Sequence, residues 1–317
     1  MGLKEGTRAA RLAKVVGLVG LVGVGATGCS TEEVLRFGWP VGVTEQAHRM
    51  QELWTWSVVA ALAVGAIVWG LILWSVAFHR KKGEELPRQV AYNLPLELVL
   101  IVVPTVIVAV LFYFTAITQN FVTNKTGDAD VTVDVVAFQW NWEFKYPQYK
   151  IPGAQPVNGE DPVVSTVGSS GEVPLMVLPQ GKRILFNLES TDVIHSFYVP
   201  EFHFKRDVFP QPHKNNQDAS FEISGIDRTG SLVGRCAELC GVYHAVMNFE
   251  IRVLEPAVFD RYMDLRAEKN PETGLLYTAS EALTELDCGE LCTPYAVTTK
   301  PFDTDRTVRE ASSGGGR

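Results

Sequence analysis

The chain has 317 residues, of which 46% are hydrophobic, and a formal net charge of -8 at pH 7. This length allows about two domains, or one domain with membrane segments and tails. The acidic balance argues against nucleic acid as a partner, because phosphate binding needs clustered Lys and Arg, and it suits a cationic protein partner that is attracted by opposite charge.

The first 28 residues are typical of an export signal. Four basic residues precede a short apolar segment, residues 15–26, which is too short to span a bilayer. The segment runs into Ala26-Thr27-Gly28-Cys29, which is similar to a bacterial lipoprotein processing site, where the Cys is lipidated and becomes the mature N-terminus. The alternative is a buried thiol after a plain signal, but the small residues before Cys29 and the polar residues after it favour lipidation. Residues 29–52 are then an extracytoplasmic segment.

Two uncharged apolar runs, residues 53–78 and 98–124, predict two membrane-spanning helices. Each run exceeds the roughly 20 residues that cross the hydrocarbon core. Residues 79–97 connect them and hold the cluster His79-Arg80-Lys81-Lys82, so the positive-inside rule places this loop in the cytoplasm. Everything after Lys125 is therefore expected on the extracytoplasmic face of the cell membrane, in agreement with an exported N-terminus.

Glu97 lies at the cytoplasmic start of the second run. A carboxylate at this depth often only reaches out to the lipid headgroups. If it faces protein instead, it is a candidate for a proton relay. Both interpretations stay open from the residues alone.

Short strands are the pattern of residues 125–256. Alternation over residues 131–137 predicts a half-buried strand, residues 174–193 show the same pattern around a Pro-Gln-Gly turn, and Gly and Pro turns separate the remaining segments. Many short strands of this kind predict a β-sandwich or barrel. Residues 149–171 are rich in Gly, Pro, Ser and Asn and predict an inserted surface loop. Further short strands are expected at residues 220–223, 232–235 and 247–254.

The strongest chemical signal lies in residues 236–247, which gather two Cys, a His and a Met; a second imidazole, His195, lies upstream. Soft sulfur ligands with imidazole favour copper, and a weak Met ligand beside Cys and His is typical of electron-transfer copper. A mononuclear site of that type uses one Cys, whereas two thiolates can bridge a metal pair. The donor set is Cys236, Cys240, His244, Met247 and His195.

Three other interpretations of Cys236 and Cys240 remain: a disulfide, a structural zinc site with the two His, or two buried thiols. A disulfide leaves both His and Met247 without a role. Zinc accounts for two Cys and two His but not for Met247. Copper uses all five side chains, so we favour it over zinc, and zinc over a disulfide.

The C-terminal extension, residues 257–317, has helical composition at residues 257–268 and 280–286. It also contains Cys288-Gly289-Glu290-Leu291-Cys292, for which a local disulfide is expected outside the cytoplasm. This pair repeats the spacing of Cys236 and Cys240, but no His or Met lies nearby, which argues against a second metal site. Residues 311–317 have nothing to bury and are expected to be disordered.

The motif Cys236-x-Glu238-x-Cys240-Gly241-x-x-His244-x-x-Met247 resembles the cytochrome c oxidase subunit II family, and the resemblance extends over about residues 45–256. It implies a membrane α-helical hairpin followed by an all-β cupredoxin-like Greek-key barrel that carries a dinuclear copper centre, Cu-A. Cys236 and Cys240 are then the bridging thiolates, His195 and His244 the terminal imidazoles, and Met247 the weak axial ligand. Glu238 is implied to bind copper through its backbone carbonyl, while its carboxylate helps to hold a Mg or Mn ion shared with subunit I.

Two further residues acquire roles from the same resemblance. In the segment Gln139-Trp140-Asn141-Trp142, the first Trp matches the surface residue through which electrons enter, so Trp140 is the candidate; the alternative is that both Trp only pack, which fits Trp142 better. Glu97, seven residues before Pro104, matches a carboxylate at the mouth of a proton channel.

The implied function is that of subunit II of a respiratory oxidase. It accepts electrons from a c-type cytochrome, soluble or membrane-tethered, and passes them to haem in subunit I, where O₂ reduction is coupled to proton translocation. Subunits I and III and the lipid bilayer are the expected partners, and the chain alone is not expected to reduce O₂. Residues 149–171 and the extension are not common to the family, and we expect them to contact another protein.

Other functions were weighed against this one. A nitrous oxide reductase module is soluble and carries a second, larger copper domain, and subunit II of a quinol oxidase lacks the thiolates. A copper-delivery or structural lipoprotein needs exchangeable ligands and no proton-channel carboxylate.

Overall fold

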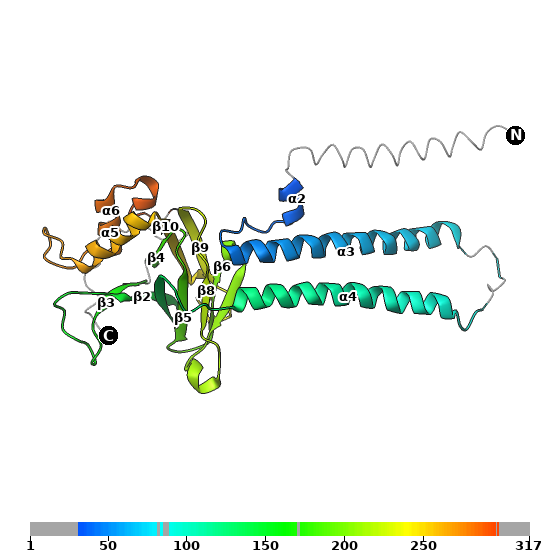
Figure 1. The fold of residues 1–317 in the computed structure, drawn as a ribbon, viewed down its shortest axis with the longest axis horizontal. Coiled ribbons are helices and arrows are strands. Elements are labelled where there is room, and N and C mark those ends of the chain that lie inside the picture. Colours follow the sequence, from blue (N-terminus) through cyan, green and yellow to red (C-terminus); the bar gives the residue numbers. More distant parts are fainter. Residues whose placement is uncertain (1–30, 81–82, 85–88, 170–171, 296, 298–317) are drawn as a thin grey trace. The chain divides into compact units, whose positions relative to one another are not determined.

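The computed structural model describes residues 31–80, 83–84, 89–169, 172–295 and 297 (Figure 1). The predicted lipidation site, Cys29, and the predicted disordered tail, residues 311–317, lie outside them. Contacts divide the chain into two units: residues 1–40 with 54–89, and residues 41–53 with 90–317. Each unit is described by itself.

Two long apolar helices, α3 (Glu45–Phe78) and α4 (Leu94–Thr123), account for both predicted spans, and the short α2 (Thr31–Arg36) precedes them. Helix α3 begins eight residues before its apolar run, because the Thr44 hydroxyl accepts a hydrogen bond from the amide of Ala47 at 3.1 Å and caps the first turn. The most apolar windows of α3 and α4 have mean hydropathies of 2.3 and 2.7 and are not buried within the chain. Such helices suit the hydrocarbon of a bilayer.

Ten described strands form two five-stranded sheets, in the orders β3-β2-β1-β5-β8 and β4-β10-β9-β6-β7. Only β1 with β5 and β4 with β10 pair in parallel; the other pairs are antiparallel. The chain passes between the sheets several times, which makes the Greek-key sandwich of a cupredoxin-like domain and confirms the predicted fold class. The strands are β1 (Val131–Phe138), β2 (Asn141–Lys150), β3 (Val163–Val167), β4 (Leu175–Pro179), β5 (Ile184–Ser190), β6 (His195–Val199), β7 (Phe204–Val208), β8 (Ser220–Ile223), β9 (Gly230–Cys236) and β10 (Asn248–Leu254).

The core between the sheets is aromatic beneath the end that carries the Cys and His residues. The rings of Phe197 and Phe249 stack at 4.9 Å, and Trp142 meets Phe249 edge-on at 5.3 Å. Gly234 on β9 leaves room for this cluster, because a Cβ there would lie 1.9 Å from the ring of Phe249. The packing therefore holds β6, β9 and β10 in fixed register beneath the site.

The sequence prediction was wrong for part of residues 149–171. Val163–Val167, placed in a surface loop by its Gly- and Pro-rich surroundings, forms β3 and pairs with β2. Four of its five residues are β-branched, which favours a strand. Strands β2, β6 and β7 were not predicted. The residues of β6 and β7 do not alternate between apolar and polar, whereas residues 141–146 of β2 do, so β2 could have been found from this pattern.

The extension forms α5 (Pro256–Ala267), α6 (Ala279–Leu286) and the short helix η4 (Gly289–Cys292). Figure 1 shows α5 beside β4, and α6 packs on α5. Phe259 and Tyr262 of α5 are buried, and Thr278 with Glu281 makes a capping box at the start of α6. A disulfide joins Cys288 to Cys292. Residues 257–295 of the extension thus pack as part of the β domain.

Candidate metal centre

The predicted metal-binding side chains lie where strands of the second sheet begin or end. His195 is the first residue of β6, Cys236 is the last of β9, and Met247 directly precedes β10. Since β9 is antiparallel to both β6 and β10, the end of β9 and the starts of its neighbours lie at the same edge. The loop between β9 and β10 adds Cys240 and His244.

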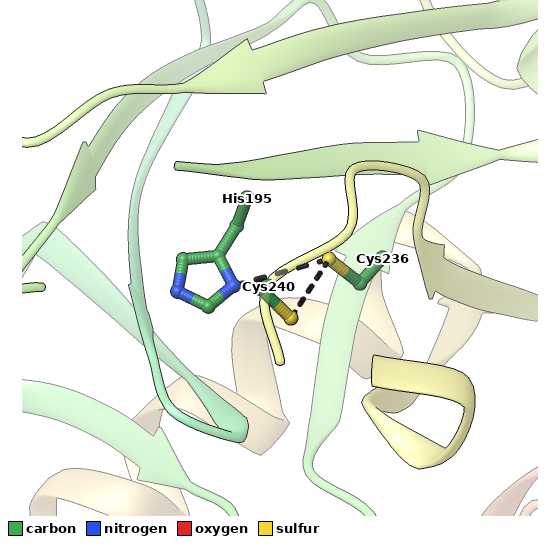
Figure 2. A group of neighbouring side chains, drawn as sticks. All are labelled: His195, Cys236 and Cys240. Atoms are coloured by element: carbon green, nitrogen blue, oxygen red, sulfur yellow. Dashed lines mark hydrogen bonds between the residues drawn. The ribbon is translucent and has the colours of Figure 1, made fainter. Parts of the chain in front are cut away.

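The five side chains touch through the atoms that bind metals. Figure 2 shows His195, Cys236 and Cys240 facing one another; the two Sγ atoms are 3.8 Å apart, and Cys236 Sγ lies 3.9 Å from His195 Nδ1. Cys240 Sγ lies 3.6 Å from His244 Nδ1 and 3.7 Å from Met247 Sδ. Both Cys are free thiols, so the structure does not contain the alternative disulfide. Each sulfur therefore has its own imidazole, and the sulfurs face each other.

The backbone carbonyl of Glu238 adds an oxygen, which lies 3.3 Å from Cys236 Sγ. The loop is held by backbone hydrogen bonds, from Cys236 N to Met247 O at 3.1 Å and from Ala237 N to Ser196 O at 3.0 Å. His195 and Met247 are buried to within 1% of their surface. The donor atoms are thus held in a fixed arrangement that is largely closed to water, and His244 is the partly exposed member.

Asp192 sets the orientation of His195, a role that the sequence analysis missed. Its Oδ1 lies 2.8 Å from His195 Nε2, and its carboxylate also accepts hydrogen bonds from the amides of Gln139 and Val193 at 2.7 and 2.6 Å. When Nε2–H donates to this carboxylate, the lone pair of Nδ1 points to Cys236 and is available to a metal. The sequence signal that could have identified this partner is an Asp three residues before His195.

The two thiols differ in acidity. Burial raises the pKa of Cys236, but hydrogen bonds from His195 and the neighbouring backbone outweigh it and bring the value to about 7. Burial and the adjacent Cys236 raise the pKa of Cys240 to about 12. Without a metal, one thiolate therefore forms near neutral pH, and binding of a cation releases the second proton.

The donor set fits copper better than zinc. Thiolate, imidazole and thioether are soft or borderline ligands, which copper takes together in electron-transfer sites. A tetrahedral zinc site would use two Cys and two His and would leave the buried Met247 without a ligand role. Because Cys240 Sγ already touches both His244 and Met247, the thioether belongs to the site.

Trp140 connects the site to the surface. Its indole Nε1–H donates to the carbonyl of Cys240 at 3.2 Å, and the Gln139 amide donates to the same oxygen at 2.7 Å. Trp140 is partly exposed, whereas Trp142 is fully buried and donates to the carbonyl of Met247 at 3.4 Å. The two Trp therefore touch different residues of the same loop, and only Trp140 reaches solvent.

The other predicted site residue, Glu97, lies in the first turn of α4. Its Oε1 accepts a hydrogen bond from the amide of Asn93 at 3.0 Å, and the Asn93 side chain accepts from Leu96 N at 3.4 Å. Within this chain Glu97 caps the helix, where a carboxylate is favoured by the helix dipole.

Comparison with known proteins gives consistent matches. The family profile for cytochrome c oxidase subunit II, periplasmic domain, matches residues 131–254. The chain is 48% identical to a probable cytochrome c oxidase subunit 2 of Nocardia farcinica, covering 90% of this chain and 86% of the relative. It is 45% identical to cytochrome c oxidase subunit 2 of Mycobacterium tuberculosis, covering 88% and 85%. A crystal structure of the periplasmic domain of subunit II from Bradyrhizobium japonicum is 27% identical with a TM-score of 0.35, covering 44% of this chain and 95% of that one.

Proposed function

This chain belongs to the cytochrome c oxidase subunit II family, and we propose that its copper site is dinuclear and receives electrons from a c-type cytochrome through Trp140. Membership makes it a subunit of a haem–copper oxidase, anchored in the membrane by two spans with its β domain on the extracytoplasmic face. The copper-delivery and nitrous oxide reductase alternatives do not fit relatives matched over nearly their whole length.

The proposed ligands of the copper pair are Cys236 and Cys240 as bridges, with His195 on one side and His244 with Met247 on the other. The Glu238 carbonyl completes the set. When bound, the copper pair supplies a one-electron carrier. The chain's own contribution is to hold these donors in one geometry, so that little rearrangement accompanies a change of charge.

The observation that carries the proposal is the hydrogen bond from Trp140 Nε1 to the carbonyl of Cys240. It connects a partly exposed aromatic ring to the backbone of a proposed bridging ligand through one contact. A donor that docks over Trp140 thus comes within one side chain of the metal centre. The exposed residues Leu239 and Val242 of the same loop offer such a donor an apolar surface.

The proposal extends to the other members of the complex. The Glu238 carboxylate is assigned to a Mg or Mn ion shared with subunit I, since hard oxygen ligands suit both ions. Glu97 is assigned to the mouth of a proton channel, and subunit III is a further partner. Lipidation of Cys29 would anchor the N-terminus to the bilayer.

Electron paramagnetic resonance of the purified, copper-loaded oxidase tests the metal assignment. We expect hyperfine splitting from two equivalent copper nuclei that share one unpaired electron. Splitting by a single nucleus would contradict the bridging roles of Cys236 and Cys240, and zinc with no copper signal would contradict the whole assignment.

The variant Trp140→Ala tests the electron route. We expect kcat/KM for cytochrome oxidation to fall about 100-fold, which corresponds to about 2.7 kcal/mol, with the copper spectrum unchanged. Trp140→Phe keeps an aromatic ring but removes the donor N–H, so an intermediate rate measures the hydrogen bond to Cys240. Wild-type turnover in Trp140→Ala with intact copper would rule out this route.

A further inference from the structure

We propose that Tyr243 is a second residue of the electron-input site: its ring positions the indole of Trp140, and its exposed part contacts the donor protein. The inference rests on the proposed function, because it takes Trp140 as the residue that receives the electron.

The indole of Trp140 is held by residues of a single loop. Tyr243 meets it edge-to-face, with ring centroids 4.9 Å apart and an interplanar angle of 76°. Gly241 lies against the indole, where a Cβ would be 3.0 Å from Nε1, and its φ of +129° suits glycine. Together with the hydrogen bond to the Cys240 carbonyl, these contacts all come from the loop between Cys240 and His244. The orientation of Trp140 is therefore set by the metal-binding loop itself.

The side chain of Tyr243 is also exposed to solvent. Tyr243 is 56% exposed, although its ring packs on Trp140. Tyr is enriched among the residues that dominate binding at protein interfaces, because it offers a large rigid area with a polar end. Leu239 and Val242 of the same loop are also exposed, so this loop presents several apolar side chains to a partner.

A cavity lies beside the rings of Trp140 and Tyr243. Trp140 and Tyr243 line one cavity of about 610 Å³, together with Val246, Pro174 and Asn248. Both rings of the aromatic pair border this cavity, which gives a docked protein room to insert a side chain against them. Tyr243 also directly precedes His244 in the chain, so a partner that contacts the Tyr243 ring touches the neighbour of a proposed ligand.

The partner that fits is the reduced c-type cytochrome of the proposed function. Its ferrous haem loses one electron and becomes ferric, and the copper site of this chain gains that electron. Neither Trp140 nor Tyr243 gains or loses a proton. Tyr243 acts by holding the indole and the donor in place.

The test compares Tyr243→Ala with Tyr243→Phe in the assembled oxidase. For Tyr243→Ala we expect kcat/KM with reduced cytochrome to fall about 10-fold, mainly through KM, with an unchanged copper resonance spectrum. Tyr243→Phe keeps the ring and should restore a rate near wild type. Oxidation of the small donor tetramethyl-p-phenylenediamine needs no docking surface and should stay unchanged in both. Tyr295→Ala, an exposed Tyr of the extension, is the matched control.

Three results would overturn the inference. They are wild-type kcat/KM in Tyr243→Ala, an equal loss in Tyr243→Phe, or a changed copper spectrum with an equal loss for the small donor, which would show a structural role. If the proposed electron route through Trp140 is wrong, a different result is expected: Trp140→Ala keeps its activity. A slow Trp140→Ala beside a normal Tyr243→Ala would reject only the role of Tyr243.

Discussion

Strand β10 serves two buried polar sites that differ in one property. Its start follows Met247 at the copper site, and its outer face carries Glu250 and Arg252 beneath the C-terminal extension. Both groups of side chains are buried in the same sheet. They differ in whether the buried groups are satisfied by the protein alone.

Beneath the extension the protein satisfies its own charges. Each guanidinium nitrogen of Arg252 has a partner, in the Glu250 carboxylate at 2.7 Å and in the carbonyls of Leu291, Thr293 and Tyr295 at 2.6 to 3.3 Å. The other oxygen of Glu250 accepts from the amide of Val297 at 2.9 Å. Such a network fixes residues 291–295 and 297 of the extension on β10 and pairs both buried charges within the protein.

At the copper site the contacts between the sulfur atoms and their neighbours are long. The contacts of Cys236 and Cys240 with His195, His244 and Met247 measure 3.6 to 3.9 Å, and sulfur is a weak donor and acceptor. Their lone pairs remain available. The comparison teaches that a closed polar network marks a structural site, whereas converging donors with unused lone pairs mark a site for a metal.

The largest effect is expected from Arg252→Met, which leaves Glu250 buried without its cation. We expect the free energy of unfolding of the full chain in detergent to fall by about 3–5 kcal/mol, measured by urea unfolding. The double variant Glu250→Gln with Arg252→Met should recover part of the loss, because no lone charge remains. Lys150→Met breaks an exposed pair with Asp161 and is the control, with at most about 1 kcal/mol expected. A loss below that of the control would show that the network does not stabilise the fold.

A smaller effect is expected at the copper site from Asp192→Ala, which removes the partner of His195 Nε2. Copper affinity should fall about 10–100-fold, because the imidazole loses its fixed tautomer and orientation. Competition with a copper chelator measures it, and urea unfolding of the copper-free chain measures separately the stability lost with the hydrogen bonds from the amides of Gln139 and Val193. Asp161→Ala removes an exposed carboxylate and serves as the control. Unchanged affinity in Asp192→Ala would mean that packing alone orients His195.

The smallest effect concerns Glu222, a second buried carboxylate whose ion-pair partner, Arg183, is itself partly exposed. Burial raises the pKa of Glu222, but hydrogen bonds from Arg183 and Thr126 outweigh it and hold the pKa below its ordinary value. The unfolded chain then binds more protons, so this stabilisation is present above an unfolded pKa of about 4.3 and is lost as pH falls through the folded pKa.

We therefore expect Glu222→Gln to lower the free energy of unfolding by about 1.5 kcal/mol at neutral pH, and by progressively less below about pH 4. Urea midpoints of both chains over a series of pH values measure the difference. A gap that widens on acidification would contradict the sign.

The features of this molecule that depend on a single segment could be predicted from the sequence. The two spans depend only on the length and hydropathy of α3 and α4, and four of the five donor side chains lie within residues 236–247, on the loop from β9 to β10. The β class followed from alternation in β1, where every second residue is buried. These features are set within one segment, so the order of residues along the chain is enough to predict them.

Contacts between distant segments were decided only by the tertiary structure. His195 lies 41 residues from Cys236, and Trp140 lies 100 residues from the carbonyl that its indole binds. Sheet order and register bring them together, and a shift of one residue in a strand would turn His195 away from the site. The same holds for β10, whose two buried faces reflect the core on one side and the extension on the other. Residue type and spacing determined which donors this chain has, whereas strand pairing decided which of them meet, because pairing depends on every neighbouring strand at once.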